Sequence, residues 1–429
     1  MGERLRLLFC DHLSIARGKY LPADKIGDGE SRFALPLFGT HYDKDLLKAP
    51  GAGLMDGLPD MVCRYKAADI RDSWDAGQKV VVGSLYDNDG APLALCGRSA
   101  LQRAVAAWQA RGLAPKIGIE LECYALIATE SGRLVPYDNP GGVVYGTGAF
   151  TDPLRFTDAI WETAERMGFK LEMMTAEYDA PQFEFTLKAD DALAAMDDVF
   201  LFRQMAREVA LEFGVILTFM PKPIAEAAGS GMHINFSFTD TDGNNALAAG
   251  QTGTPAMNDL ARGCVAGLMH HHAGLAGLVA PTATSYQRLQ PASLSGYWQN
   301  WAGDHRGVTV RVVGSGNAAR LEHRAADASA NPYTAVAAVL QASMLGQADQ
   351  NAYALQAMET GDCMENTDAK TGTAVDLRGA IADLEKDQTL VDAVGAGLVA
   401  NHAFMKRKEF TKTRNLEGDE LRDFYVYFI

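Results

Sequence analysis

The sequence lacks a run of about 18 apolar residues, the length that a helix needs to span a bilayer. It also lacks an excess of positive charge, because 39 Lys and Arg stand against 54 Asp and Glu, for a formal net charge of −15. Nucleic-acid backbones and anionic membrane surfaces attract basic faces, so we expect neither as a partner. The basic opening segment carries Asp11 and His12 within its apolar stretch, which disfavours a secretory signal.

Closely spaced cysteine pairs are also missing, since the six cysteines are scattered along the chain. This distribution is typical of reduced residues in an intracellular core and not of a disulfide framework or a zinc site. A GxxxxGK[ST] loop is absent as well, which excludes a P-loop nucleotide site. What is present, a hydrophobic fraction of 48% with acidic net charge, predicts a cytoplasmic protein with a large core.

Two domains of an α+β fold are predicted, comprising residues 1–97 and 98–429. The first domain alternates short strand-like runs with Gly, Pro and Asp turns, whereas the second mixes helices and strands without regular βαβ units. The apolar periodicity and the turn residues predict helices at 99–112, 153–167, 190–213 and 332–346, strands at 117–127 and 182–187, and a polar loop at 349–373.

Four predicted strands are apolar on one face and polar on the other. Side chains two residues apart share a face of a strand, so Glu120 and Glu122 project together from IGIELECYAL. The polar faces of the other three strands carry Glu184; His233, Asn235 and Ser237; and Arg320, Glu322 and Arg324. One such strand is most simply a solvated sheet face. Four of them, each within a strongly apolar stretch, favour a shared site.

Carboxylates that meet in one cleft raise each other's pKa unless a cation neutralises them. A set of carboxylates with a single histidine suits a hard divalent ion such as Mg²⁺ or Mn²⁺. Arginines nearby suit phosphate groups, because guanidinium makes bidentate contacts with them. The combination is typical of phosphoryl transfer from a nucleotide such as ATP.

Taken in order, these segments resemble the glutamine synthetase superfamily. The matching segments are GIELE, EYDAPQFE, TFMPKP followed by GSGMH, PTATSYQRLQP, HRGVTVR and RLEHRAADASANPY. The resemblance implies a small N-terminal β-grasp-like domain and a large catalytic domain with a curved antiparallel sheet and helices. It also implies a homo-oligomeric ring, a dodecamer or a hexamer, with active sites between subunits.

The resemblance also assigns roles to individual residues. One divalent ion would be held by Glu122, Glu177 and Glu184, and a second by Glu120, His233 and Glu322. Arg306 and Arg311 would bind the transferred phosphoryl group as catalytic and nucleotide-binding residues, while Ser237 and Arg320 would lie beside the nucleotide. The substrate carboxylates would be held by Arg288 and Arg324, and the amino group of glutamate by the backbone of Gly229.

Two departures from the family pattern concern the substrates. Where glutamine synthetases carry a flap glutamate that holds and deprotonates ammonium, RLQPASLSGY has Leu294. A leucine accepts no proton, but it favours an alkyl group by about 0.8 kcal/mol per buried CH₂. Ala228 stands before GSGMH, where the family often has an asparagine close to the glutamate substrate.

The expected function is therefore an ATP-dependent ligase that activates the γ-carboxylate of glutamate as an acyl phosphate. The activated group would then be joined to an organic amine, as in the γ-glutamylpolyamine and γ-glutamylalkylamide or anilide synthetases, with Leu294 among the substrate-binding residues. One alternative is glutamine synthesis with ammonia. A second is another acid in place of glutamate, suggested by Ala228. A third is a non-catalytic scaffold or sensor, which the retained carboxylates disfavour.

Overall fold

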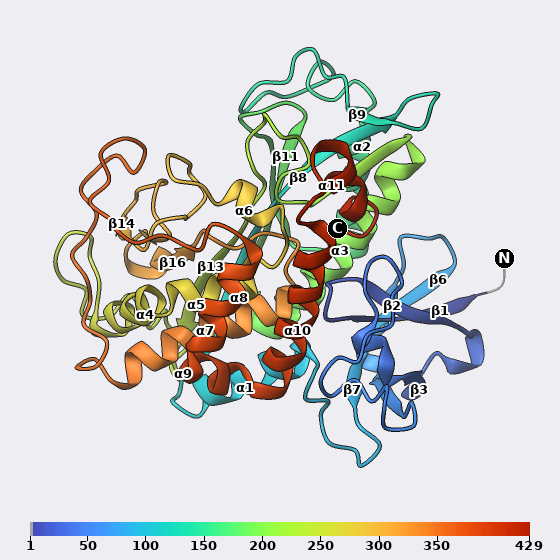
Figure 1. Ribbon diagram of the computed structural model, residues 1–429, viewed down its shortest axis with the longest axis horizontal. Helices are drawn as coiled ribbons and strands as arrows, with labels where there is room; N and C mark the ends of the chain where they lie inside the picture. The colour runs from blue at the N-terminus through green and yellow to red at the C-terminus, as the bar shows by residue number, and fades with distance from the viewer. Residues whose placement is uncertain (1–2) are drawn as a thin grey trace.

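The computed structural model describes residues 3–429, and its first part forms two small sheets (Figure 1). Their strand orders are β2-β1-β6-β5 and β3-β4-β7. The strands are β1 (Arg4–Cys10), β2 (Ala16–Pro22), β3 (Gly29–Ala34), β4 (Asp60–Tyr65), β5 (Arg71–Asp72), β6 (Gln78–Val82) and β7 (Ser84–Tyr86). Between them lie the 3₁₀ turns η1 (Ala23–Lys25), η2 (Leu35–Gly39) and η3 (Ala67–Asp69).

A nine-stranded sheet forms the centre of the remaining chain. Seven strands run in the order β10-β11-β8-β13-β16-β15-β14, and β12 and β9 pair with β8. All pairs are antiparallel except the parallel pair of β14 and β15. The strands are β8 (Ala114–Ala128), β9 (Leu134–Pro136), β10 (Leu171–Ala176), β11 (Gln182–Asp191), β12 (Val215–Thr218), β13 (Met232–Thr239), β14 (Trp301–Gly303), β15 (Val310–Val313) and β16 (Arg320–His323), with the turn η4 (Gly316–Ala318) before β16.

Helices cover the apolar face of this sheet and complete the α+β fold, as predicted. The helices are α1 (Gly97–Gln109), α2 (Phe156–Met167), α3 (Ala192–Glu212), α4 (Asp259–His270), α5 (His272–Val279), α6 (Ser285–Arg288), α7 (Pro332–Ala348), α8 (Leu377–Lys386), α9 (Gln388–Val394), α10 (Ala396–Thr413) and α11 (Gly418–Tyr425). Helices α1 and α3 pack against β8, and α7 packs against α1 and α4. None of the helices within residues 3–429 combines the length and apolar character that crossing a membrane requires.

Alternation along β8 places the core and the polar site on opposite faces of one strand. Ile117, Ile119, Leu121 and Cys123 are fully buried in the main hydrophobic core. Glu120 and Glu122 point to the other face, as the two-residue period of a strand requires. The central strand therefore anchors the fold with one set of residues and presents carboxylates with the other.

The start of helix α2 differs from the sequence-based expectation. The pair Asp152-Pro153 predicted a start at residue 153, but α2 begins at Phe156. The Asp152 carboxylate accepts hydrogen bonds from the backbone N–H of Thr157 at 2.8 Å and from its hydroxyl at 2.6 Å. The aspartate thus binds the N-terminus of the helix from a position further upstream than a standard cap, and residues 153–155 form the turn between them.

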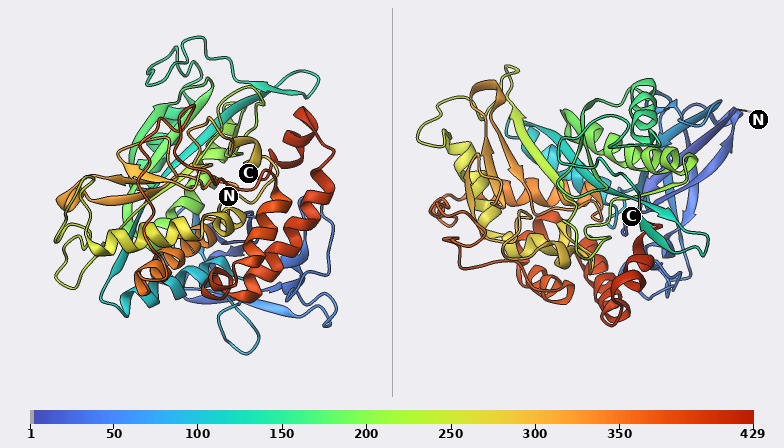
Figure 2. Two further views of the ribbon diagram at one scale, coloured as in Figure 1. Left: turned by 60° about the vertical axis from the view of Figure 1, so that its left-hand side comes forward. Right: turned by 90° about the horizontal axis from the view of Figure 1, so that it is seen from above.

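The small sheets are held to the larger part by polar contacts that are buried or partly buried. The Arg6 guanidinium pairs with Glu208 of α3 at 2.7 and 2.8 Å. The Asn331 side-chain amide donates to the carbonyl of Asp11 at 2.8 Å. Helix α10 lies beside the N-terminal sheets in Figures 1 and 2, and its Asn401 amide donates to the carbonyls of Phe38 and Pro50.

Candidate active site

The polar residues of four neighbouring strands meet because of the register between those strands. Glu184 of β11 lies opposite Glu122 of β8, and His233 of β13 lies opposite Glu120 of β8. Farther along the sheet, Glu322 of β16 lies between Asn235 of β13 and Arg311 of β15. The antiparallel pairing therefore turns four separate sequence motifs into one continuous polar surface.

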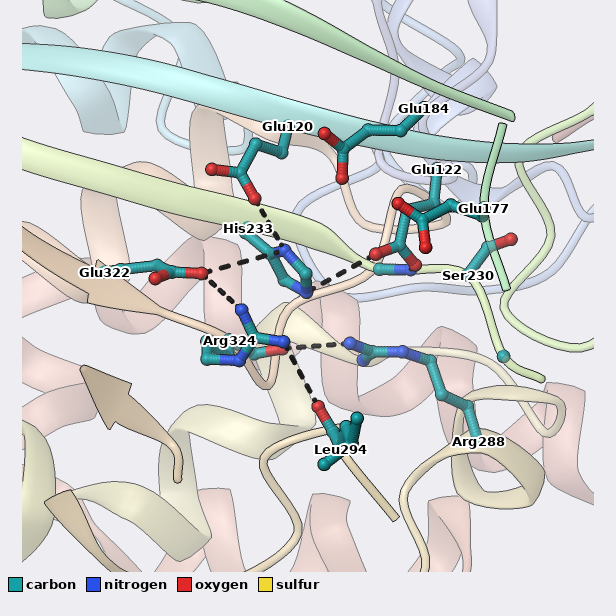
Figure 3. Close-up of polar contacts among 12 residues, drawn as sticks. Glu120, Glu122, Glu177, Glu184, Ser230, His233, Arg288, Leu294, Glu322 and Arg324 are labelled. Carbon is teal, nitrogen blue, oxygen red and sulfur yellow. Dashed lines mark hydrogen bonds and ion pairs between the residues drawn. The ribbon is translucent and has the colours of Figure 1, made fainter. Parts of the chain in front are cut away.

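His233 stands at the centre of this surface, with its ring within reach of three carboxylates (Figure 3). Its Nδ1 lies 2.9 Å from Glu120 Oε2 and 3.8 Å from Glu322 Oε1, and its Nε2 lies 3.7 Å from Glu122 Oε1. In Figure 3 the four glutamates of β8, β11 and the segment after β10 lie on one side of His233, and Arg324, Arg288 and Leu294 lie on the other.

The carboxylates respond to this crowding in opposite ways. Burial, together with the charges of Glu120, Glu122 and Glu177, raises the pKa of Glu184 to about 8. Burial and the charge of Glu122 also raise the pKa of Glu177. Burial alone would raise the pKa of Glu120, but the hydrogen bond and charge of His233 outweigh it and lower the value to about 2. The repulsion between the carboxylates is therefore offset at Glu120 by His233 and persists at Glu184 and Glu177.

This donor set fits divalent cations. In each of two groups, Glu120–His233–Glu322 and Glu122–Glu184–His233, one atom from every residue lies within 4.8 Å of the others. Oxygen ligands with a single imidazole suit Mg²⁺ or Mn²⁺, and a cation there would remove the repulsion that raises the pKa of Glu184. The carboxylate of Glu177 falls outside both groups, although Glu177 lines the same cavity.

Glu322 is the point at which the carboxylates meet the arginines. It is 1% exposed and accepts a hydrogen bond from Arg311 Nη1 at 3.0 Å and a second from Arg324 Nη1. Arg320 lies farther out, where its Nε donates to Asn235 Oδ1 at 3.0 Å. Ser237 follows two residues after Asn235 on β13, opposite Lys116 of β8. Arg311, Arg320 and Ser237 are thus linked to the polar surface but do not line its main cavity.

That cavity has a volume of about 420 Å³. The predicted site residues that line it are Glu120, Glu122, Glu177, Glu184, Gly229, His233, Arg288, Leu294, Arg306 and Arg324. Arg306 is exposed, whereas Arg288 is buried and its guanidinium donates to the carbonyls of Ala325 and Arg324. With Lys222, the cavity is therefore lined by cations from four separate segments as well as by carboxylates.

The segment from Ala227 to Gly231 is held at the cavity wall by side chains of other elements. The Tyr124 hydroxyl donates to the carbonyl of Ala228 at 2.9 Å, and the Gln182 amide donates to the carbonyl of Gly229 at 3.1 Å. Asp179 accepts from the N–H of Ala228, and Lys222 donates to the carbonyl of Ala227. The position of this segment is therefore set by residues from β8, β11 and the loops beside them.

Both glycines of GSGMH are required by close packing. A Cβ at Gly229 would lie 2.4 Å from Cγ of Arg288. A Cβ at Gly231 would lie 2.7 Å from Arg288 Nη2 and 2.8 Å from His233 Nε2. The backbone N–H of Gly231 donates to Glu122 Oε2 at 2.5 Å, so this approach also orients a carboxylate of the site.

Sequence reasoning missed several residues that line the cavity, namely Tyr145, Tyr178, Gln182, Lys222, Gln287, Gln290, Ser293 and Ser295. Gln182 stands within EYDAPQFE, and Ser293 and Ser295 flank Leu294, so proximity to recognised motifs could have found them. Tyr145 lies in a Gly-rich segment without apolar periodicity, and its sequence carries no signal of a site.

Comparisons with known proteins all point to the same family. The family described as "Glutamine synthetase, catalytic domain" matches residues 94–423. A glutamine synthetase of Halobacterium salinarum is 30% identical over 430 residues, covering 98% of this chain and 93% of that protein. The gamma-glutamylputrescine synthetase PuuA of Escherichia coli is 30% identical over 79% of this chain and 75% of its own length. The gamma-glutamylethanolamide synthetase GlnA4 of Streptomyces coelicolor is 32% identical over 68% of this chain and 63% of its own length.

Solved structures share the fold at lower identity. A structure described as a novel glutamine synthase homolog superposes with a TM-score of 0.85 at 24% identity, covering 100% of this chain and 99% of that one. The structure of GmaS without ligand superposes with a TM-score of 0.83 at 24% identity, covering 99% of this chain and 97% of that one.

Proposed function

The chain belongs to the glutamine synthetase superfamily, and we propose that it joins glutamate to an organic amine in preference to ammonia. Membership makes it an ADP-forming, ATP-dependent glutamate ligase whose nucleophile is ammonia or an amine. The observation that carries the choice of amine is Leu294. Its side chain is 53% exposed and lines the cavity, at the position where the family pattern has a proton-accepting glutamate.

The backbone of Leu294 contacts Arg324, one of the arginines that line the cavity. Its carbonyl accepts a hydrogen bond from Arg324 Nη2 at 3.4 Å, and Arg324 also pairs with Glu322. The leucine side chain offers ammonium neither a charge partner nor a hydrogen bond, and charge-assisted hydrogen bonds contribute about 1.5–3 kcal/mol. An alkyl or aryl group on the nucleophile gains from the same side chain, because apolar surface leaves water there.

The proposed reaction has two steps. The γ-carboxylate oxygen of glutamate attacks the terminal phosphorus of ATP, ADP leaves, and an acyl phosphate forms. The amine nitrogen then attacks the acyl carbon, phosphate leaves, and the nitrogen loses one proton. Divalent ions held by the two Glu–His groups would supply charge neutralisation for the phosphoryl oxygens.

The residues of the chain bind and orient the reactants in this scheme. Arg306 and Arg311 bind the phosphoryl group, and Ser237 and Arg320 lie by the nucleotide. Arg288 and Arg324 bind the substrate carboxylates, with Gly229 at the amino group. The fixed guanidinium of Arg288, which donates to two backbone carbonyls, supports a positioning role, because a preorganised donor loses little freedom when it binds.

We also propose that the active site is completed by a second subunit in a homo-oligomeric ring. The residues that line the cavity, among those the structure describes, all lie between positions 120 and 324. The small N-terminal sheets thus contribute nothing to the cavity of their own chain, which leaves them available to a neighbouring one.

The test is phosphate release from ATP and glutamate with Mg²⁺, comparing ammonium with methylamine, ethylamine, isopropylamine, ethanolamine, putrescine and aniline. We expect kcat/KM for at least one organic amine to exceed that for ammonium tenfold or more. Ammonium as the best nucleophile would make the protein a glutamine synthetase and refute the proposal. Turnover only with another carboxylic acid would identify a different acid substrate, and ATP binding without any turnover would favour a scaffold.

A substitution at the flap position tests the role of Leu294 directly. Leu294→Glu should raise kcat/KM for ammonium about 10–100-fold, which corresponds to one charge-assisted hydrogen bond. The matched control is Leu211→Glu, since Leu211 is 58% exposed on α3 and does not line the cavity. An unchanged ammonium preference in Leu294→Glu would show that the amine binds elsewhere.

A further inference from the structure

Three large uncharged side chains line the catalytic cavity while remaining open to solvent. Tyr145 is 70% exposed, Tyr178 is 76% exposed and Leu294 is 53% exposed. Exposed apolar surface that gathers at a cavity marks a contact surface, whereas single exposed residues elsewhere need no explanation. We name these three residues the apolar wall.

Backbone contacts tie the apolar wall to the candidate metal and phosphate residues. The N–H of Tyr145 donates to the carbonyl of Ala176 at 2.9 Å, and the N–H of Tyr178 donates to Glu177 Oε2 at 3.3 Å. The backbone of Tyr145 is therefore bonded to the residue before Glu177, and Tyr178 is the residue that follows Glu177. The carbonyl of Leu294 accepts from Arg324, so the third member is fixed next to an arginine of the cavity.

The charges that line the cavity restrict what can lie against the wall. The acidic residues that line it, among residues 3–429, are Glu120, Glu122, Glu177 and Glu184, all of which the resemblance to the family assigns to metal binding. The other ionisable groups of the lining include four cations, Lys222, Arg288, Arg306 and Arg324. A second ammonium on the nucleophile would thus be repelled by these cations, and the carboxylates of the lining would already be neutralised by the proposed metal ions.

We infer that the nucleophile is a primary monoamine whose single uncharged alkyl or aryl substituent packs against Tyr145, Tyr178 and Leu294. This inference rests on the proposed function and adds the chemical class of the amine. Burial of each further methylene against the wall should lower KM for the amine about fourfold until the wall is covered. Aromatic substituents should also bind, because tyrosine rings stack on them in offset or edge-to-face geometry.

The experiment measures kcat and KM for six amines in the full-length enzyme and in Tyr178→Ala. The amines are methylamine, ethylamine, propylamine, butylamine, benzylamine and putrescine. In the unaltered enzyme, KM should fall along the alkyl series, and putrescine should be at least tenfold poorer than butylamine. In Tyr178→Ala the dependence on chain length should flatten, while KM for ATP and the oligomeric state stay unchanged. The matched control is Phe150→Ala, because Phe150 is 78% exposed in the same region but does not line the cavity.

A second variant tests the charge argument independently. Tyr178→Glu places a carboxylate on the wall and should shift the preference from butylamine towards putrescine. Putrescine as the best substrate of the unaltered enzyme, or a chain-length dependence that survives in Tyr178→Ala, would overturn the inference. Either result leaves the proposed function standing, because organic amines would still be used. Ammonium as the best nucleophile refutes the proposed function itself.

Discussion

The buried carboxylate of Glu184 faces the charges of Glu120, Glu122 and Glu177, which together with burial raise its pKa to about 8. Glu120 stays ionised because His233 lies 2.9 Å away, so the repulsion in the metal-free site falls mainly on Glu184. Residues at functional sites are often retained at a cost to stability, and the metal-binding role that we propose for Glu184 would explain this cost.

We predict that Glu184→Gln raises the thermal stability of the metal-free protein at pH 8 to 9 and reduces ligase activity at least a hundredfold. The amide keeps the shape of the side chain and removes the charge that burial disfavours. Thermal denaturation with and without Mg²⁺ measures the effect, and Mg²⁺ should raise the Tm of the unaltered protein more than that of Glu184→Gln. A lower Tm for metal-free Glu184→Gln would contradict this account of the site.

At the scale of elements, the segment from Ala227 to Gly231 shows how strands and loops position the backbone that we propose binds the substrate. Tyr124 on β8 and Gln182 on β11 each donate to a carbonyl of this segment, and Gly231 donates to Glu122. The same two strands carry Glu122 and Glu184. A substitution that displaces this segment should therefore raise KM for the substrate more than it lowers the stability of the fold.

We predict that Tyr124→Phe raises KM for glutamate about fivefold, with little change in kcat, because one hydrogen bond of about 1 kcal/mol to the Ala228 carbonyl is lost. Steady-state kinetics at saturating ATP and amine measure the change. Tyr137→Phe is the control, since its hydroxyl hydrogen-bonds to Asp152 at 2.9 Å beside helix α2 and does not line the cavity. That variant should lower Tm and leave KM for glutamate unchanged; equal effects on KM in both would exclude a positioning role for Tyr124.

At the scale of the whole molecule, three buried histidines that do not line the cavity couple stability to pH. Burial lowers the pKa of His12, His272 and His402 to about 4 each. His272 Nε2 lies 3.0 Å from the carbonyl oxygen of Tyr297, and His402 Nε2 lies 2.8 Å from that of Gly277, so both rings serve as neutral donors. The three histidines belong to different parts of the chain. Protonation of any one of them places a charge in a buried environment, which destabilises the folded state.

We predict that the contribution of these three histidines to the free energy of unfolding is constant above about pH 6.5 and decreases as the pH falls towards 4. The sign follows because the unfolded chain binds protons at these histidines near pH 6.5, whereas the folded chain resists protonation until about pH 4. Each histidine contributes up to about 3 kcal/mol to this loss. Urea unfolding at a series of pH values measures the slope, which His272→Gln should reduce; an identical slope in that variant would contradict the assignment.

Much of the fold follows from local patterns in the sequence. The Asn331-Pro332 pair predicted the start of α7, and the Asn331 side chain accepts from the N–H of Thr334 at 3.1 Å. Gly168 ends α2 with φ of +72°, a conformation that glycine adopts at little cost. The predicted start of α2 was wrong by three residues, because Asp152 binds the N-terminus of the helix from farther upstream than a standard cap. The domain boundary between residues 97 and 98 stays a prediction.

By itself, the sequence determined which residues face away from the core, because alternation along a strand is a local property that Glu120, Glu122, Glu184 and Glu322 display. It also determined the family, through the order of its motifs. Only the tertiary structure decided how those faces join, since the pairing of Glu184 with Glu122 and of His233 with Glu120 depends on strand register. It alone brought Tyr145, Tyr178 and Leu294 to one cavity, because contacts between distant segments leave no period in the sequence.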